Sequence, residues 1–574
     1  VGKGVVTSAI RNLRRGEIFD ETFLMTVATA GAILIHELPE AVGVMLFYSV
    51  GEALQDHAVD RSRASIKALV DIRPDYANVR RSGETVRVPP GEVRVGEEIV
   101  VRPGERIPLD GEVIAGSSFV DTSALTGESV PRRVEPGDAV LAGTVNTQGL
   151  LAIRVSKPFA ESSVSKILEL VESAGARKAP TERFITRFAR YYTPAVVLGA
   201  LGVAVLPPLF VDGAPLSQWM YRALVLLVIS CPCALFLSIP LGYFGGIGGA
   251  SRHGILVKGA SFLDALTQVD TVVMDKTGTL TQGVFKVRRV TALNGFAEDA
   301  VLDYAAHAES FSNHPIAGSI IEAHGKAVDL SRVGRFEEIS GHGVRAEVDG
   351  KLVVAGNDRM LHRENVPHDD CEAEGTVVNV AVDGVLAGRI VVADELKPDA
   401  AGAVRSLRDL GVRRTVMLTG DDPGVARRIA AAVGIDEVYA GLLPEEKVQV
   451  LERIAKERGT GAGKVAFVGD GINDAPVLTR ADVGIAMGAL GSDAAIEAAD
   501  VVIMDDMPSK VGKAIAIARR TRAIVLQNIV FALGVKAAVI VLGAVGVANM
   551  WEAVFADVGV SLIAVLNAAR VLRS

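Results

Sequence analysis

Six long apolar stretches constrain the fold of this chain more than any other feature of its sequence. They lie near residues 19–36, 38–59, 188–211, 220–242, 521–547 and 550–570. Each is close to the length of about 20 residues that a helix needs to cross the hydrocarbon core of a bilayer. Hydrophobic residues make up 49% of the 574 residues, which fits a membrane protein. The sequence therefore predicts six transmembrane helices.

The distribution of arginine predicts the orientation of these helices. The short outer connections between the helices hold almost no basic residue, and Arg222 is the exception. The opposite side holds Arg11, Arg14, Arg15, Arg61, Arg63, Arg519, Arg520, Arg522, Arg570 and Arg573. The positive-inside rule places both termini and both long insertions in the cytosol. Residues 1–18 are either an amphipathic surface segment or a solvated tail. Because residue 1 is Val, we interpret the chain as a fragment or a trimmed product.

Charge and cysteine content exclude two classes of protein. The net charge is −8 and no segment is strongly basic, so we expect no nucleic-acid partner. The three cysteines are too few for a disulfide scaffold.

The two long insertions have different patterns. In the first, about 61–187, valine alternates with polar residues between Gly and Pro turns, which predicts a small β-rich domain. In the second, about 251–518, short apolar runs end in Asp or Gly and alternate with helical patterns, which predicts a parallel α/β sheet. Within it, about 292–393, two Asp-Gly pairs between valine-rich runs predict tight hairpins and a separate inserted domain.

Acidic residues follow the predicted parallel strands at Asp275, Asp421, Asp470 and Asp474. The carboxyl ends of such strands form the active-site edge of a sheet, so these carboxylates should meet there. Clustered carboxylates favour Mg²⁺, and a carboxylate can accept a phosphoryl group as an aspartyl-phosphate. Donors to the phosphate oxygens are then expected from Thr277, Thr419 and Lys447. A single Asp at a strand end is more often a helix cap, so the prediction depends on their number.

Three motifs carry a resemblance to a known family. Asp275-Lys276-Thr277-Gly278-Thr279 resembles the phosphorylation motif of P-type ATPases, Thr126-Gly127-Glu128-Ser129 their dephosphorylation loop, and Gly469-Asp470-Gly471-Ile472-Asn473-Asp474 their Mg²⁺-binding hinge. The resemblance covers essentially the whole chain. It implies that Asp275 is phosphorylated by ATP, that Glu128 positions the hydrolytic water, and that Mg²⁺ is held by Asp275, Thr277, Asp470 and Asp474.

The inserted domain also resembles a part of this family. His314-Pro315 and Gly341-His342-Gly343 are weak signals alone, because His-Pro and paired glycines usually mark turns. In this position they resemble the nucleotide-binding signature of the heavy-metal P-type ATPases. The resemblance implies that His314 contacts adenine and that Gly341 and Gly343 let the backbone approach the nucleotide.

The fourth apolar stretch contains Cys231-Pro232-Cys233. Pro232 breaks a helix, and such a break in a membrane requires a protein-lined cavity. A locally unwound turn lets both thiols face one soft metal ion; the alternative is two small buried side chains. The Cys-Pro-Cys sequence resembles the membrane signature of the heavy-metal subgroup.

Two charged residues within the last spans indicate the cargo. Lys536 and Asp557 resemble the pair of the zinc, cadmium and lead exporters, whereas the Asn-Tyr and Met-Ser-Ser sequences of copper exporters are missing. A carboxylate ligand also suits a divalent ion. We expect Asp557 to bind metal with Cys231 and Cys233, and Lys536 to pair with Asp557 as a counter-ion when metal is absent. Glu52 is either a relay ligand or a boundary residue.

The sequence thus predicts a monomeric multi-pass protein of a bacterial inner membrane that uses ATP and Mg²⁺ to export Zn²⁺, Cd²⁺ or Pb²⁺. A copper exporter is the alternative, and a phosphatase domain on a passive anchor or a metal-sensing receptor fits less well, because neither needs Thr126–Ser129. Relatives usually have two further helices and often a Cys-x-x-Cys domain before the first span; neither is in this sequence. The predicted parts are the first two membrane helices (1–60), actuator domain (61–187), third and fourth membrane helices (188–250), HAD-like phosphorylation domain (251–291 and 394–518), α+β nucleotide-binding domain (292–393) and last two membrane helices (519–574).

Overall fold

The computed structural model describes most of the chain in two compact units. The described residues are 2–14, 21–70, 74–81, 84–122, 131–165, 179–230, 233–312, 315–339, 342–368, 376–421, 423–457, 463–470, 474–488, 493–547 and 549–573. The first unit comprises residues 1–268, 500–505 and 513–574, and the second comprises 269–499 and 506–512.

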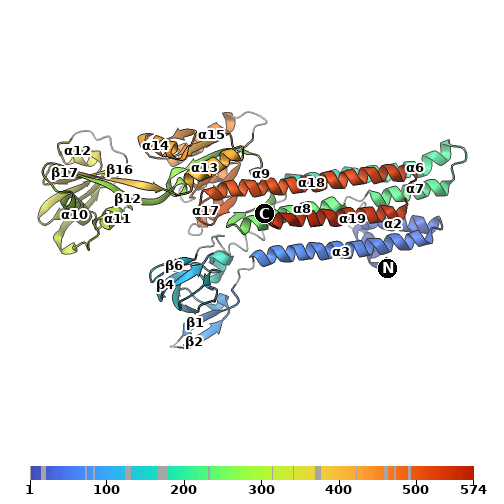
Figure 1. Cartoon of the computed structure of the whole chain (residues 1–574), viewed down its shortest axis with the longest axis horizontal. Helices are drawn as coiled ribbons and strands as arrows, with labels where there is room; N and C mark the ends of the chain where they lie inside the picture. Colours follow the sequence, from blue (N-terminus) through green and yellow to red (C-terminus); the bar gives the residue numbers. More distant parts are fainter. Residues whose placement is uncertain are drawn as a thin grey trace. The chain divides into compact units, whose positions relative to one another are not determined.

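Long helices form the membrane part of the first unit (Figure 1). They are α2 (Glu21–Leu34), α3 (Leu38–Val70), α6 (Pro180–Phe210), α7 (Leu216–Ile229), α8 (Cys233–Ser251), α18 (Ser509–Val545) and α19 (Met550–Ala568). A shared apolar cluster that includes Met25, Leu224 and Val554 holds several of them together. The N-terminal helix α1 (Lys3–Arg14) contributes Val5 to this cluster, which favours the surface segment over a solvated tail.

Four segments are long and apolar enough to cross a membrane, within the ranges described above. They are Tyr191–Phe210, Leu216–Ser251, Ser509–Gly543 and Met550–Val571, and they correspond to the third to sixth predicted spans. The apolar segment of α2, Thr22–Leu34, is shorter, and α3 is long but carries many charged residues beyond its first half. The first two spans are helical, but their crossing of a bilayer stays a prediction.

The fourth span is interrupted where its proline predicts a break. The helix α7 ends at Ile229, and α8 begins at Cys233. Cys231 and Pro232 lie between these helices and outside the described residues. The last carbonyl groups of α7 lose their partners in a continuing helix, so they need other donors.

The first insertion is β-rich, as its valine pattern predicts. One sheet has the order β2-β1-β3-β9-β4-β7 and a second the order β6-β5-β8. The strands are β1 (Ala77–Arg81), β2 (Glu84–Val88), β3 (Glu98–Val101), β4 (Gly111–Ala115), β5 (Ser118–Asp121), β6 (Arg132–Val134), β7 (Ala139–Val140), β8 (Val145–Asn146) and β9 (Leu151–Val155). Their inward side chains form a single apolar core that includes Val79, Ile99 and Ile153.

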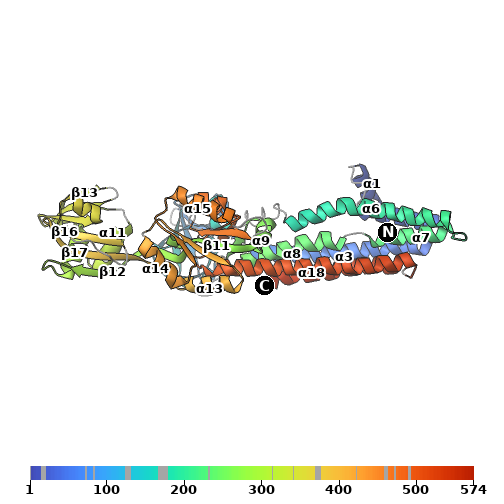
Figure 2. The same ribbon diagram turned by 90° about the horizontal axis from the view of Figure 1, so that it is seen from above.

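The second unit contains the predicted parallel sheet. Five strands are all parallel and have the order β21-β20-β11-β18-β19. They are β11 (Val269–Asp275), β18 (Arg414–Leu418), β19 (Glu437–Tyr439), β20 (Lys464–Gly469) and β21 (Val483–Ala486). The helices that alternate with these strands along the chain are α13 (Ala400–Asp409), α14 (Pro423–Val433), α15 (Pro444–Glu457), α16 (Ala475–Arg480) and α17 (Asp493–Ala498). Figure 2 labels α13, α14 and α15 around β11. The short strands β10 (Ile255–Val257) and β22 (Val501–Ile503), in the first unit, pair antiparallel.

The inserted domain is an antiparallel sheet of the order β12-β17-β16-β15-β14-β13. Its strands are β12 (Thr281–Ala292), β13 (Val333–Ile339), β14 (Gly343–Val348), β15 (Lys351–Gly356), β16 (Thr376–Val382) and β17 (Val385–Leu396). Both predicted hairpins are confirmed: Asp349-Gly350 joins β14 to β15, and Asp383-Gly384 joins β16 to β17, with positive φ at all four residues. The helices α10 (Glu298–Ala308), α11 (Pro315–His324) and α12 (Asp358–Arg363) pack on the sheet.

Several predicted domain limits fall within continuous elements. Residues 60 and 61 both lie in α3, residues 187 and 188 in α6, and residues 518 and 519 in α18, while β17 runs through 393 and 394. At three of these limits, one continuous helix (α3, α6 or α18) thus runs from the apolar sequence into the polar sequence. Hydropathy marks where the apolar residues stop, but not where the helix stops.

Candidate active site and metal-transport site

The parallel sheet brings the predicted acidic residues to one edge. Asp275 is the last residue of β11 and pairs in register with Leu418 of β18, while Met274 pairs with Val468 of β20. Thr419 directly follows β18, and Asp470 directly follows β20. The carboxyl ends of three adjacent strands therefore place Asp275, Thr419 and Asp470 at the same edge, as expected for a parallel sheet.

Lys447 joins two of the predicted carboxylates. Its ammonium Nζ lies 2.7 Å from Asp275 Oδ1 and 2.8 Å from Asp474 Oδ1. Lys447 is on α15, and Asp474 immediately precedes α16, so three separate elements meet at this point. Asp275 is 6% exposed and Asp474 1% exposed, which places both carboxylates away from bulk water.

The charges at this edge do not balance. Burial raises the pKa of Asp275, and repulsion from Asp474 and Asp470 raises it further. The attraction of Lys447 lowers this pKa but offsets only part of the increase. Burial alone would lower the pKa of Lys447, but the attraction of Asp275 and Asp474 more than compensates and raises it. Lys447 thus faces more carboxylates than it can neutralise, and this donor set fits Mg²⁺, which prefers carboxylate and phosphate oxygens.

The loop after β11 approaches the second carboxylate strand closely. Thr277 and Gly278 follow Lys276 in this loop, and Gly278 has φ of 70°. A Cβ added at Gly278 would lie 3.0 Å from Cβ of Asp470, so only glycine fits without displacement. Gly278 therefore lets the loop that carries Thr277 pass directly beside Asp470, and the contact of Thr277 with phosphate or Mg²⁺ stays a prediction.

Asp421 lies at the same edge but in a different contact. Its Oδ2 is 2.5 Å from Lys276 Nζ, and its backbone N–H donates to Thr419 Oγ1 at 3.1 Å. The sequence reasoning did not assign a partner to Lys276, although it quoted this residue in the motif. It also missed Lys397, whose Nζ donates to the carbonyl of Gly278 at 2.6 Å and holds the loop. A lysine in a polar stretch has no pattern of its own that would reveal such a contact.

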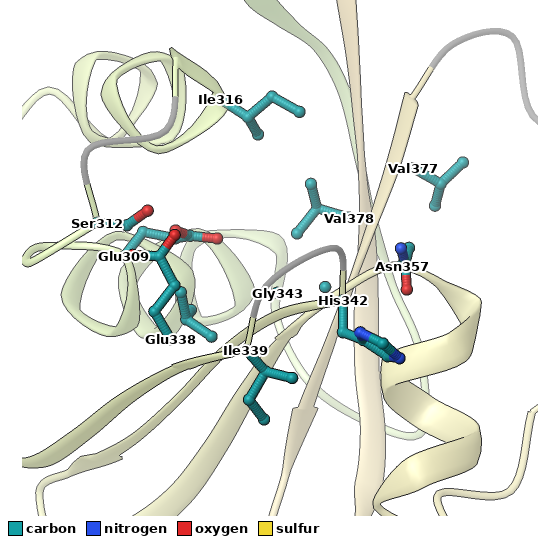
Figure 3. A pocket seen from close by; sticks show the side chains of 12 residues that line it. Glu309, Ser312, Ile316, Glu338, Ile339, His342, Gly343, Asn357, Val377 and Val378 are labelled. Carbon is teal, nitrogen blue, oxygen red and sulfur yellow. The ribbon is translucent and has the colours of Figure 1, made fainter. Parts of the chain in front are cut away.

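The inserted domain contains a cavity of about 310 Å³ (Figure 3). Gly343 lines it and has φ of 143°, and a Cβ there would lie 2.2 Å from the carbonyl oxygen of Ala355. His314 and Gly341 lie outside the described residues. The lining residues are Glu309, Ser312, Ile316, Glu338, Ile339, His342, Gly343, Val344, Gly356, Asn357, Val377 and Val378.

Glu309 is a residue of this cavity that the sequence reasoning missed. Its carboxyl group is buried, and burial together with repulsion from Glu338 raises its pKa to about 7. The two carboxyl groups lie near each other in Figure 3. Glu309 stands five positions before His314, and only the packing of α10 against the sheet brings it to the cavity. Its protonated form can donate a hydrogen bond to a ligand in the cavity.

Lys536 and Asp557 are in contact within the membrane part. Lys536 Nζ lies 2.5 Å from Asp557 Oδ1, and both side chains are nearly fully buried. Lys536 also donates to the carbonyl of Ile229 at 3.1 Å, which is the last residue of α7. The lysine thus donates to a carbonyl at the C-terminal end of α7, where carbonyl groups depend on donors from outside the helix, and the sequence did not indicate this contact.

The remaining predicted residues are only partly described. Cys233 begins α8, but its side chain is not described, and Cys231 and Glu128 lie outside the described residues. Glu52, on α3, is exposed. A Cβ at the preceding residue, Gly51, would lie 2.4 Å from Val558, so α3 and α19 pack closely beside Glu52 and Asp557.

Comparison with known proteins identifies the class. Residues 71–172 match the P-type ATPase actuator domain, and residues 269–482 match the haloacid dehalogenase-like hydrolases. A crystal structure of a zinc-transporting PIB-type ATPase in the E2.Pi state has a TM-score of 0.63 to this chain and 36% identity, and the match covers 100% of this chain and 93% of that one. The protein is a multidomain membrane protein of the P-type ATPase class.

Two curated relatives define the group more closely. The zinc-transporting ATPase of Synechocystis is 60% identical over 572 residues, which cover 100% of this chain and 79% of that relative. The cadmium, zinc and cobalt-transporting ATPase of Bacillus subtilis is 55% identical over 573 residues, covering 100% of this chain and 82% of that relative. The chain therefore belongs to the P-type ATPase family, in the group of its heavy-metal-transporting members.

Proposed function

We propose that this ATPase exports a soft divalent metal ion, Zn²⁺ with Cd²⁺ and Pb²⁺ as further cargo. The observation that carries the proposal is the ion pair of Lys536 and Asp557 beside the interrupted fourth span. Together, a buried carboxylate and the two thiols of the Cys231-Pro232-Cys233 sequence would offer oxygen and sulfur ligands to a borderline divalent ion. The two relatives described above are named for zinc, cadmium and cobalt, which agrees with this cargo.

The catalytic step proceeds at Asp275. Its carboxylate oxygen attacks the γ-phosphorus of ATP, the bond to the bridging oxygen of ADP breaks, and an aspartyl-phosphate forms. Lys447, 2.7 Å from Asp275, is positioned to donate to the phosphoryl oxygens as negative charge develops on them, and Thr277 and Thr419 supply further donors. Asp421 positions Lys276 through their contact.

Mg²⁺ would be held by Asp275, Thr277, Asp470 and Asp474. When bound, it neutralises the phosphate and carboxylate charges that Lys447 leaves unbalanced. In the second half of the cycle, Glu128 positions a water molecule that attacks the phosphorus, and the bond to the Asp275 oxygen breaks. The nucleotide occupies the cavity beside Gly343. His314 contacts its adenine, and Gly341, like Gly343, lets the backbone approach the nucleotide closely.

The membrane site alternates between two charge balances. With metal bound, Asp557 joins Cys231 and Cys233 as a ligand, and its contact with Lys536 is released. After the metal leaves, Lys536 returns to Asp557, so that no ionised carboxylate remains alone in the protein interior. Glu52, next to the close contact of α3 with α19, serves as a relay ligand between this site and water.

The protein acts as a monomer in the bacterial inner membrane, with both termini in the cytosol. The arginine distribution supports this orientation. A copper exporter is the alternative function, and Asp557 argues against it because a carboxylate suits a divalent ion better than Cu⁺.

The ATPase activity of purified, lipid-reconstituted protein against a panel of metals tests the proposal. We expect Zn²⁺, Cd²⁺ and Pb²⁺ to stimulate hydrolysis and Cu⁺ to have little effect. Asp557→Ala should abolish the stimulation and still be phosphorylated by inorganic phosphate, because its phosphorylation domain is intact. Glu552→Gln, in the first turn of the same helix, is the control and should behave as wild type. Strongest stimulation by Cu⁺ would favour the copper alternative.

A further inference from the structure

The inserted domain carries two groups of side chains with the ligand types of a metal site. Each consists of one aspartate and two histidines whose ligand atoms lie within 4.8 Å of one another. The first group is Asp303, His307 and His324, and the second group is Asp358, His362 and His368. The two groups differ in what surrounds their ligand atoms.

An arginine closes the first group to a cation. Arg332 Nη2 lies 2.8 Å from Asp303 Oδ2, and Arg332 Nη1 lies 3.2 Å from His307 Nε2. The backbone N–H of Asp329 also donates to His307 Nε2, at 3.3 Å. The guanidinium supplies the positive charge that a metal ion would bring, so this group is an internal ion pair.

The second group is built on α12. Asp358 and His362 are four positions apart and therefore lie on the same helix face, with His362 Nε2 3.3 Å from Asp358 Oδ2. The chain then returns, and His368 Nε2 lies 2.6 Å from Asp358 Oδ1. The side chains of His362 and Asp358 are 66% and 56% exposed, so an ion can enter from water.

A backbone contact orients His368 for metal binding. Its Nδ1 lies 2.8 Å from the carbonyl oxygen of Val366, and since a carbonyl only accepts, Nδ1 carries a proton. The other ring nitrogen, Nε2, is thereby turned toward Asp358. Protein zinc sites commonly orient a histidine ligand in this way, through a hydrogen bond from its second nitrogen.

We propose that Asp358, His362 and His368 form a surface site for a divalent ion of the zinc class. Zn–N and Zn–O bonds of about 2.0–2.1 Å place tetrahedral ligand atoms about 3.3 Å apart. His362 Nε2 already has this separation from Asp358 Oδ2, whereas His368 Nε2 contacts the other oxygen, Oδ1, at 2.6 Å. Binding therefore requires the exposed Asp358 carboxylate to turn so that one of its oxygens and both imidazoles face the ion. Three protein ligands leave a fourth position for water. Arg389 adds positive charge near His368, which opposes the binding of a cation and should weaken its affinity.

The site adjoins the nucleotide cavity. Asn357 lines the cavity and caps α12 by accepting a hydrogen bond from the N–H of Met360 at 3.2 Å. An ion bound by Asp358, His362 and His368 would therefore link α12, which begins at the cavity, to the chain that follows it and would stabilise the helix. The proposal does not depend on which metal the membrane site carries.

Zinc binding to the full chain tests the site. The background is the double variant Cys231→Ala/Cys233→Ala, which removes the thiols proposed for the cargo. Equilibrium dialysis of this protein against Zn²⁺ should show binding that His362→Ala weakens more than about tenfold, because one of three ligands is lost. Co²⁺ in place of Zn²⁺ should give visible absorption bands that the same substitution removes.

His324→Gln, in the first group, is the matched control and should leave Zn²⁺ affinity unchanged. Zinc should also raise the melting temperature of the background protein, but not that of His362→Ala. Equal zinc affinity with and without His362, or an equal loss in His324→Gln, would overturn the site. If the cargo assignment to the two cysteines is wrong, the background binds extra zinc, but the difference made by His362→Ala remains.

Discussion

Lysine is paired with buried carboxylate in two regions of this molecule, with different charge balances. In the phosphorylation domain, Lys447 contacts Asp275 and Asp474, and Asp470 adds its charge. In the membrane part, Lys536 contacts Asp557 and a neutral carbonyl, that of Ile229. Counting only the side chains that the structure describes, the first arrangement has an excess of negative charge, and the pair of Lys536 and Asp557 is neutral.

The difference follows from what can reach each site. In the proposed mechanism the edge of the parallel sheet binds Mg²⁺, and a deficit of positive charge there favours the binding of this cation. In the membrane, an unpaired charge costs several kcal/mol and no counter-ion is freely available, so the protein supplies its own. In the proposed function, the site that binds Mg²⁺ from solution is therefore left negative, whereas the site that must release its metal ion carries a lysine as a replacement.

The largest expected effect is that of Asp275→Asn. An amide is not a nucleophile here, so phosphoenzyme and turnover should fall below detection. Incorporation of radiolabelled phosphate from ATP, measured after acid quench, checks this. The exposed Asp409→Asn is the control and should label as wild type. Acid-stable labelling of the Asp275→Asn variant would show that the phosphorylated residue is elsewhere.

Lys447→Met should have the next largest effect. It removes the cation that offsets two buried carboxylates and donates toward the phosphoryl group, and such losses cost about 10²–10³ in kcat. The same variant should need a different Mg²⁺ concentration for half-maximal activity, because Mg²⁺ must then also offset the carboxylate charge that Lys447 balances. Steady-state ATPase across Mg²⁺ concentration measures both. An unchanged kcat would remove the catalytic role of Lys447.

Lys536→Ala tests the neutral site and should have a smaller effect at its best pH. Without the lysine, Asp557 must take a proton after metal release, so metal-stimulated turnover should fall more steeply as pH rises. Metal-stimulated ATPase across pH compares the variant with wild type, and Lys536→Arg is the control that keeps the charge. Superimposable profiles of Lys536→Ala and wild type would refute the counter-ion role.

Glu309→Gln should have the smallest effect. It extends the comparison of the two lysine–carboxylate sites to a buried carboxyl group whose pKa is affected by Glu338, which repels it, and by Ser312, which donates a hydrogen bond to it. The folded-state pKa is raised from 4.5 to about 7, so between these values the native state binds more protons than the unfolded state. Stability from this group is therefore lost as pH rises through this window. We expect the Glu309→Gln substitution to flatten the pH dependence of the melting temperature there. A slope equal to that of wild type would contradict the raised pKa.

Much of the fold could be predicted because its signals are local. The Asp-Gly hairpins at 349–350 and 383–384 follow from residues that accept positive φ next to valine-rich strands. The helix α15 follows from Pro444, its two acidic neighbours and apolar spacing. The placement of Asp275, Thr419 and Asp470 at one edge follows from parallel strands that each end in a polar residue. The hairpin and helix patterns each lie within a few consecutive residues, and the shared edge follows from the parallel arrangement of the strands alone.

The pairing of Lys536 with Asp557 was expected from the sequence, but the other contacts that decide the charges came only from the tertiary structure. Lys447 is 172 positions from Asp275, Lys536 is 307 positions from Ile229, and Lys276 is 145 positions from Asp421. A lysine in a helix has the same local pattern whether it faces water, a carboxylate or a broken helix. The sequence determined which chemical groups this ATPase possesses and which strands and helices carry them. Which lysine neutralises which carboxylate was decided by packing, because only the packed chain brings such distant segments within hydrogen-bond distance.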